Sequence, residues 1–156
     1  YGALSATGNP HYHEGFEPLV PGFKYAEFND SENVKSLVDA NRTAAIIVEC
    51  VQGEGGVNVM TQEFADTLTK LCREKEVQTG NGRTGTLYSY EHLGLRPDIV
   101  TTAKGVGGGL PIGICMFSEK TKNALVPGTH GTTFGGNPVA CAGALSIVER
   151  LNENPP

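Results

Sequence analysis

Short apolar runs alternate with amphipathic helices along this chain, and this alternation constrains the fold more than any other feature. Residues 44–48 are continuously apolar, as expected for a strand buried on both faces of a parallel sheet. Residues 98–103 and 112–117 are predicted to form two further strands. Three helices are predicted, one starting at Asn29, one over residues 61–75, and one starting at Asn137. The alternation predicts an α/β fold.

The alternation is interrupted after the second helix. An α/β chain is expected to return to an apolar strand within a few residues of a helix end. Here residues 73–75 pass directly into residues 76–85, a polar and glycine-rich stretch predicted as a loop. The sequence therefore predicts that a strand is missing between about Arg73 and Glu76.

Composition excludes two classes of partner. The chain has 12 Lys and Arg against 17 Asp and Glu, a net charge of −5, which argues against a nucleic-acid or anionic-membrane binder. Its apolar runs reach only about seven residues, too short for a transmembrane helix. The four cysteines are scattered singly, which favours reduced, mostly core thiols in a cytoplasmic protein. His11 and His13 form an H-x-H pair without a third ligand nearby, so we interpret them as surface histidines.

Lys104 is the strongest candidate for a catalytic residue. It follows the strand at residues 98–103 and precedes the glycine-rich turn 105–109. A lysine there is expected to be partly desolvated, which lowers the pKa of its amine and frees it to react with a carbonyl group. The glycines would let a planar group approach the backbone. The alternative is a lysine that extends to the surface, and spacing alone does not separate the two.

Residues 132–138 are a second candidate segment. Hydroxyl groups and backbone amides stand just before a helix start, an arrangement that suits a phosphate group. An ordinary capped helix start is the alternative. No G-x-x-x-x-G-K-[ST] motif is present, so the glycine-rich turn after Lys104 is not a P-loop.

Four ordered motifs resemble those of class III aminotransferases, which have the fold type I architecture and use pyridoxal 5'-phosphate. They are ECVQGEGG at 49–56, EVQTGNGRTG at 76–85, TAKGVGGGLPIG at 102–113 and HGTTFGGNP at 130–138. Within the family, the wording is most similar to acetylornithine aminotransferases. The resemblance implies that the chain is part of the large, mostly parallel-sheet domain, with an incomplete sheet.

The resemblance also implies a role for each matching residue. Lys104 would hold the cofactor covalently and then act as the general acid and base. Gln78 would lie beside the 3-hydroxyl of the ring, and Val77 would contact a ring face. Thr133 would reach the phosphate of the partner subunit's cofactor in a homodimer. Glu54 would act as a gate that helps the site change between its two substrates.

The implied reaction transfers the δ-amino group of N-acetylornithine to 2-oxoglutarate, a step of arginine biosynthesis. The chain departs from the family at two points. Lys75 stands where the family has the aspartate that pairs with the ring nitrogen, at the predicted gap. The family's aromatic and arginine segment, expected upstream of Tyr1, is absent. We therefore expect a fragment that is inactive alone, and the Lys75–Glu76 Cα distance would test whether the gap is real.

We divide the chain into three parts. Residues 1–28 form a loop-rich first segment, residues 29–152 the central part of the cofactor-binding domain, and residues 153–156 the start of a linker to an absent C-terminal domain. Other hypotheses stay open. One is a related enzyme: an ornithine, 4-aminobutyrate or succinylornithine aminotransferase, or a glutamate-1-semialdehyde mutase. Another is a non-catalytic remnant that binds a phosphate or a partner subunit.

Overall fold

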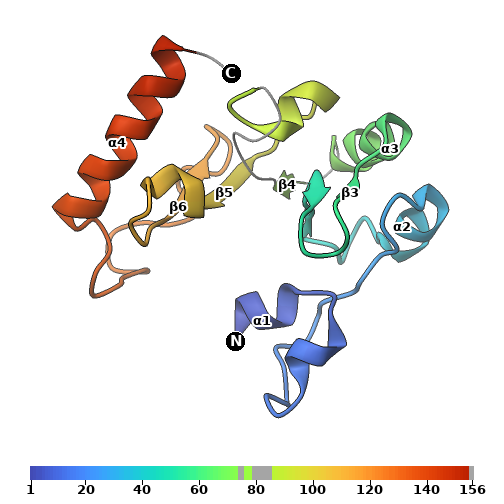
Figure 1. Ribbon diagram of the computed structural model, residues 1–156. Helices are drawn as coiled ribbons and strands as arrows, with labels where there is room; N and C mark the ends of the chain where they lie inside the picture. The colour runs from blue at the N-terminus through green and yellow to red at the C-terminus, as the bar shows by residue number, and fades with distance from the viewer. Residues whose placement is uncertain (74–75, 79–85, 155–156) are drawn as a thin grey trace. The chain divides into compact units, whose positions relative to one another are not determined.

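The computed structural model describes residues 1–73, residues 76–78 by their backbone, and residues 86–154 (Figure 1). By their internal contacts the residues form two compact units, Tyr1–Thr43 and Ala44–Pro156. Each unit is described by itself. The Lys75–Glu76 distance lies outside the described residues.

The first unit is held together by polar contacts. It contains α1 (Gly2–Ala6), the 3-10 helix η1 (Pro10–His13) and α2 (Ser31–Leu37). The buried Ser5 hydroxyl accepts a hydrogen bond from the Val20 amide at 3.0 Å, and the Tyr25 hydroxyl donates to the Ser5 carbonyl at 2.8 Å. The ring of His13 places Nε2 3.0 Å from the Thr7 carbonyl. His13 thus has a structural role, and we find no group of metal ligands among the described residues.

α2 begins one residue later than the sequence predicted. Its N-cap is Asp30, whose carboxylate accepts hydrogen bonds from the amides of Glu32 and Asn33 at 3.0 and 2.8 Å. Asn29 instead adopts a left-handed backbone with φ of 65°. Asparagine tolerates a left-handed backbone better than most residues do, so Asn29 turns the chain before the helix. Asp30 then caps the helix.

The second unit contains the strands that carry the α/β fold. β1 (Ala45–Ile47) pairs in parallel with β4 (Glu76–Gln78), with Ile46 opposite Val77. The prediction that residues 76–85 are entirely loop is therefore wrong for residues 76–78. Three residues are too few to produce a recognisable pattern, and it is pairing with β1 that makes them a strand. β4 in turn lies next to β5 (Ile99–Ala103).

Two antiparallel pairs complete the described strands. β5 pairs with β6 (Gly113–Phe117) over five residues, from Ile99 opposite Phe117 to Ala103 opposite Gly113. β2 (Val51–Gln52) and β3 (Asn58–Val59) form a short hairpin. The 3-10 helix η2 (Ser89–Leu93) precedes β5. The predicted strands at 98–103 and 112–117 are confirmed to within one residue.

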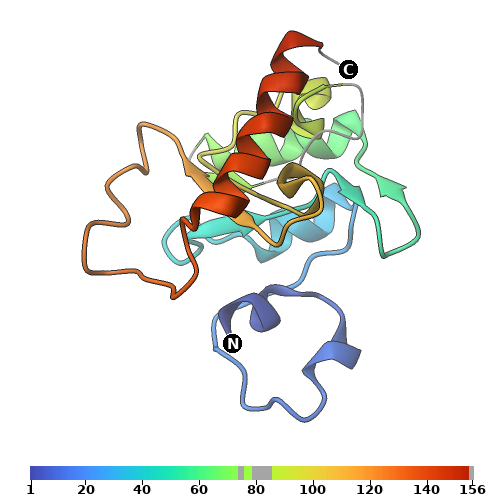
Figure 2. The same ribbon diagram turned by 60° about the vertical axis from the view of Figure 1, so that its left-hand side comes forward.

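Two helices enclose these strands. α3 (Gln62–Cys72) and α4 (Pro138–Glu153) lie on opposite sides of them (Figures 1 and 2). α3 starts at the Thr61 cap and buries Phe64, Ala65 and Leu68, as predicted for residues 61–75. α4 starts at the predicted cap, where the Asn137 side chain accepts from the Ala140 amide at 2.9 Å. The sequence therefore located both helices and their starts.

Burial is lower than the sequence predicted at two kinds of site. Ile47 in β1 is 59% exposed, so this strand is not buried on both faces. Among the described residues, β1 pairs with β4. Of the four free cysteines, Cys50 is buried and Cys72 half-buried, but Cys115 and Cys141 are exposed, so the prediction of core thiols is wrong for those two. In the described part of the chain, none of the helices is both long enough and apolar enough to span a bilayer.

Candidate cofactor-lysine site

Lys104 stands where β5 ends and a one-turn 3-10 helix, η3 (Lys104–Gly107), begins. Its backbone has φ of 58°, in the left-handed region. A lysine pays a steric cost of about 1 kcal/mol in that region, so the surrounding structure must impose the conformation. Strain of this kind is found most often at functional sites. Sequence reasoning could not detect it, because lysine gives no signal for a left-handed backbone.

The amine of Lys104 is accessible. The residue is exposed, as are its neighbours Ala103 and Gly105. The expected desolvation of Lys104 is therefore wrong for the described residues, because the chain turns outward at the end of β5. The side chain makes no hydrogen bond or ion pair with another described residue. Its exposure fits the alternative named above, a lysine that extends to the surface of the described part of the chain.

The glycine-rich turn has a packing function as well as an open face. A Cβ on Gly107 would lie 2.8 Å from Ile112 Cγ2, and one on Gly108 would lie 3.2 Å from Ile147 Cγ1. By contrast, a Cβ on Gly105 or Gly109 would have no atom within 4 Å. The expected approach of a planar group is therefore sterically open at Gly105 and Gly109, while Gly107 and Gly108 serve contacts within the protein.

Thr133 lies in the exposed loop before α4. Neighbouring residues line a hollow of about 220 Å³ together with the start of β6 and the first turn of α4: Pro111, Ile112, Gly113, Thr132, Phe134, Gly135, Gly136, Asn137, Ala140 and Cys141. Thr133 itself does not line this hollow. Pro138 has no amide hydrogen, and the Asn137 side chain accepts the hydrogen bond of the Ala140 amide. The N-terminus of α4 therefore leaves few amides for an anion. The phosphate prediction for residues 132–138 therefore depends on the threonine hydroxyls and on the backbone amides of the loop before the helix.

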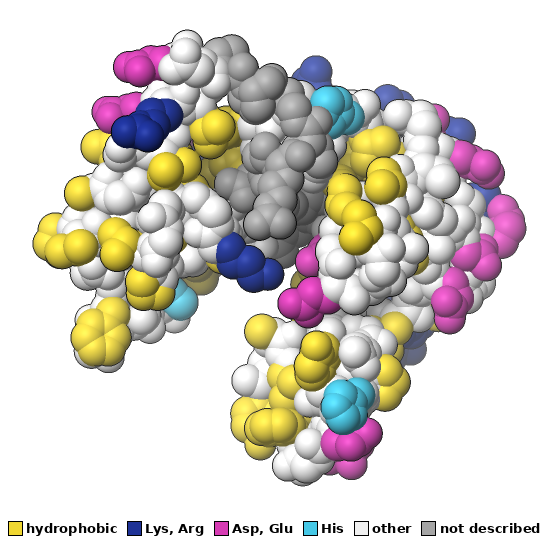
Figure 3. All heavy atoms as spheres, viewed as in Figure 1, with side chains coloured by type: hydrophobic (Ala, Val, Ile, Leu, Met, Phe, Trp, Pro, Cys, Tyr) yellow, Lys and Arg dark blue, Asp and Glu magenta, His cyan; other side chains and the backbone are white. Residues whose placement is uncertain are grey.

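Exposed apolar side chains gather over α4 and the loop before it (Figure 3). In this part of the sequence they include Phe134, at 81% exposed, Val139 and Leu145. Large exposed apolar side chains that lie close together are typical of surfaces that meet another protein.

Glu54 lies at the tip of the β2–β3 hairpin and is exposed. The tip is fixed by the side-chain amide of Asn58, whose Nδ2 donates to the Gly55 carbonyl at 2.6 Å. Val57 at the same tip has φ of 58°, which is rare for a β-branched residue. The carboxylate of Glu54 has no hydrogen bond or ion pair within the described ranges. No contact within the described ranges joins Glu54 to Lys104.

Val77 and Gln78 are placed by their backbone only. β1 and β4 run in parallel, so both strands end at one edge of the sheet, where ligands bind in open α/β sheets. β4 lies beside β5, the strand that leads into Lys104. The sheet thus brings these three predicted residues to neighbouring strands. The roles of the Val77 and Gln78 side chains, and the nature of residue 75, lie outside the described residues.

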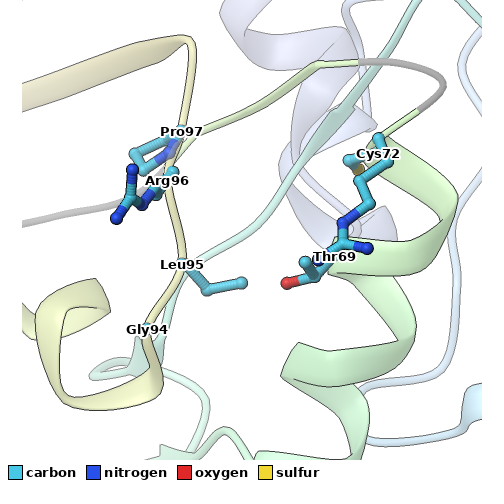
Figure 4. Close-up of a pocket in the computed structure, with 7 residues that line it drawn as sticks. Thr69, Cys72, Gly94, Leu95, Arg96 and Pro97 are labelled. Atoms are coloured by element: carbon cyan, nitrogen blue, oxygen red, sulfur yellow. The ribbon is translucent and has the colours of Figure 1, made fainter.

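A larger hollow, of about 250 Å³, lies before the start of β5 and far along the strand from Lys104 (Figure 4). Its walls are the end of α3 and the segment 94–97, and Leu95 extends across it toward Thr69. Burial, with a smaller effect of the Asp98 charge, raises the pKa of the Cys72 thiol in its wall to about 11. This hollow contains none of the predicted site residues.

A strand, a strained turn and a flanking helix therefore define an α/β protein with an exposed lysine at the end of a strand. The chain belongs to the class III aminotransferase family, whose family model, described as "Aminotransferase class-III", matches residues 1–155. It is 50% identical to the acetylornithine aminotransferase of Aquifex aeolicus over 98% of this chain. It is 47% identical to a succinylornithine transaminase of Salmonella paratyphi B over 96% of this chain.

Solved structures agree on the fold. An ornithine aminotransferase from Toxoplasma gondii superposes with a TM-score of 0.87 at 35% identity, covering 97% of this chain and 37% of that one. An acetylornithine aminotransferase from Elizabethkingia anophelis gives 0.79 at 32% identity, covering 86% and 38%. The chain has the α/β fold of part of a fold type I transaminase, with an incomplete sheet. It spans 42% of the Aquifex relative and 38% of the Salmonella relative.

The alignments bear on the interrupted sequence pattern. Two of them run over 160 and 161 residues, more than the 156 residues of the chain. These relatives therefore contain positions that have no counterpart here. This agrees with the prediction of missing residues, and the position of the gap near Glu76 stays a prediction.

Proposed function

We propose that this chain supplies the cofactor-lysine part of a pyridoxal-phosphate-dependent aminotransferase that transfers an amino group from N-acetylornithine to 2-oxoglutarate. One observation carries the proposal. The family lysine is Lys104, and it stands exposed, strained and without an ion pair to a described residue, at the end of a central strand.

The described residues fit the cofactor at its point of attachment. A carbonyl-reactive cofactor needs an unpaired amine on a fixed backbone, and Lys104 offers both. The open backbone at Gly105 and Gly109 leaves space beside that amine for a flat ring. When bound, pyridoxal phosphate supplies an electron sink for breaking the C–H bond beside the substrate nitrogen.

The remaining site residues have roles of orientation and proton transfer. Lys104 Nζ would attach the cofactor and, once displaced by substrate, carry the proton between carbon atoms. Gln78 would donate or accept a hydrogen bond at the ring hydroxyl, and Val77 would contact a ring face. Thr133 would bind the phosphate held by the partner subunit. Glu54 would control access of the two substrates, both of which carry carboxylates.

Capture of the cofactor tests the proposal. The purified chain is mixed with pyridoxal phosphate, reduced with borohydride and examined by mass spectrometry. We expect one added pyridoxyl group on Lys104, with none in Lys104→Ala. Lys120→Ala removes another lysine on the same unit and serves as the matched control. Absence of modification at Lys104, or equal modification of several lysines, would support the non-catalytic remnant instead.

A coupled glutamate assay then tests the donor. The chain is given 2-oxoglutarate with N-acetylornithine, N-succinylornithine, ornithine or 4-aminobutyrate. We expect no glutamate above background, because Lys75 replaces the expected aspartate beside the ring nitrogen. Glutamate from N-acetylornithine would overturn the expected inactivity and support the proposed donor. Glutamate from another donor alone would replace the proposed donor, since relatives named for acetylornithine and succinylornithine are 50% and 47% identical.

We also propose a homodimer in the cytoplasm. The exposed Phe134, next to Thr133, and the exposed Val139 and Leu145 of α4 support a subunit contact. Four free cysteines support a reducing compartment. Light scattering tests the dimer, and a monomer at all concentrations would contradict it for this chain.

A further inference from the structure

α4 lies against the turn that follows Lys104 with almost no space between them. A Cβ placed on Gly143 of α4 would lie 2.8 Å from Leu110 Cδ1 and 3.2 Å from the Gly107 carbonyl oxygen. One placed on Gly108 would lie 3.2 Å from Ile147 Cγ1, one helical turn further along α4. Leu110 is exposed and its methyl can move, so the fixed neighbour of Gly143 is the Gly107 carbonyl. Two glycines on facing elements therefore stand where the helix and the turn approach most closely.

Gly143 is an unfavourable residue for its position unless this approach matters. It lies in the interior of a 16-residue helix, where glycine is less favourable than alanine. Gly108 has a left-handed backbone with φ of 60° and closes η3 through its amide, which bonds to the Gly105 carbonyl at 3.2 Å. The Leu110 amide bonds to the Gly107 carbonyl at 3.1 Å. The turn is thus fixed internally and would move against α4 as one piece.

We propose that Gly143 is a positioning residue for Lys104. The inference rests on the proposed function of Lys104. Because η3 begins at Lys104 and ends at the turn that α4 contacts, the position of α4 determines the backbone conformation from which the amine projects. The close contact at Gly143 holds η3 in place, and this restraint keeps Lys104 at a φ that its own side chain disfavours.

Substitution at Gly143 gives a test with opposite signs. In an unobstructed helix position, Gly→Ala lowers the equilibrium constant for unfolding about threefold or more. If the contact is as described, Gly143→Ala raises that constant instead. Leu110→Ala removes the nearest obstructing atom, so the double variant is expected to recover stability relative to the sum of the two single changes. Ser146→Ala, at an exposed position of the same helix, is the matched control.

Two readouts at Lys104 separate positioning from general stability. In NMR spectra of the folded chain, a strong contact between the amide and α-hydrogen of Lys104 reports its positive φ. We expect this contact to weaken in Gly143→Ala. We also expect the rate of pyridoxal phosphate capture at Lys104 to fall about tenfold, with recovery in the Leu110→Ala double variant. Both measurements are made well below the unfolding midpoint.

The outcomes are distinguishable. A stabilised Gly143→Ala with unchanged φ and capture at Lys104 would overturn the inference. Loss of stability with an unchanged Lys104 would overturn it too, because Gly143 would then be structural only. If the unaltered chain captures no cofactor, the proposed function fails, while the NMR signal and the double variant still decide whether Gly143 positions Lys104.

Discussion

The two ends of β5 are built in opposite ways. Before the strand, the Asp98 carbonyl accepts from the Ser118 amide and the Thr121 hydroxyl, both at 2.8 Å. Its carboxylate accepts from the Ser118 hydroxyl at 3.1 Å and the Lys120 amine at 3.3 Å. After the strand, Lys104 is exposed, strained and without such bonds to described residues. The β5–β6 ladder reaches both ends, and the additional hydrogen bonds made by Asp98 lie at the end away from the proposed chemistry.

The largest expected difference between the ends is in thiol reactivity. Cys72 lies near Asp98, and its pKa of about 11, against an ordinary 9.0, leaves about 100-fold less thiolate at pH 8 than an ordinary thiol has. Iodoacetamide labelling followed by mass spectrometry should therefore modify Cys72 more slowly than the exposed Cys115. Asp98→Asn should speed labelling of Cys72 modestly, since burial is the main cause. Equal labelling rates of Cys72 and Cys115 would contradict the raised pKa of Cys72.

The same thiol gives a pH dependence of stability. Folded Cys72 keeps its proton up to about pH 11, whereas the unfolded thiol releases it near 9.0. Its contribution to stability is therefore present below pH 9 and is lost as pH rises from 9 to 11. Urea unfolding at pH 8, 9.5 and 11 should show a fall that is smaller in Cys72→Ala.

The Asp98 end should dominate stability. Asp98→Ala removes two bonds to a carboxylate that is 18% exposed, and we expect a loss of about 2 kcal/mol in the free energy of unfolding. Asp98→Asn keeps an acceptor for the Ser118 hydroxyl and should lose less. Urea unfolding measures both. If Asp98→Ala is as stable as the unaltered chain, the comparison of the two ends no longer holds.

The Lys104 end should gain stability when its strain is relieved. Glycine adopts a left-handed backbone without steric cost, so Lys104→Gly should be about 1 kcal/mol more stable than Lys104→Ala. At a residue with an ordinary backbone, alanine is more stable than glycine. Ala103 is extended, so Ala103→Gly should lower the free energy of unfolding. A Lys104→Ala variant that is the more stable of the pair would contradict the left-handed conformation.

The smallest effect is expected at Thr102, two residues before Lys104. Its hydroxyl is buried and has no hydrogen-bond partner among the described residues, a cost that valine at that position would avoid. Thr102→Val should raise the free energy of unfolding by about 0.5–1 kcal/mol. Thr101→Val, on the exposed face of the same strand, is the control and should change it little. Destabilisation by Thr102→Val would indicate that the hydroxyl has a partner.

Sequence patterns located the parts of this unit that are long or capped. The starts of α3 and α4, and β5 with β6, follow from periodicity and from the caps Thr61 and Asn137. The patterns failed where pairing or exposure decides. Only pairing with β1 makes residues 76–78 a strand, and no local signal distinguishes the exposed Ile47 from a buried isoleucine.

The candidate site was predictable by motif and not by geometry. Lys104 was predicted from its place between a strand and a glycine-rich turn, but neither its exposure nor its left-handed backbone has a signal in the local sequence. In the turn after Lys104, Gly107 and Gly108 contact Ile112 and α4, whereas Gly105 and Gly109 have no described neighbour. The amino-acid sequence does not distinguish these two kinds of glycine. The four motifs predicted the class III aminotransferase family, and the family model and the relatives confirm it.

The β5–β6 pair has a consequence for the order in which the chain folds. Only residues 104–112 separate its two strands, so this antiparallel ladder can close from local contacts. The parallel β1–β4 ladder must instead wait for the hairpin and α3 that lie between its strands. During synthesis, the turn that carries Lys104 would exist before α4 has been made. The turn at Lys104 would then fold early, and Lys104 would acquire its final backbone conformation only after α4 has folded against it.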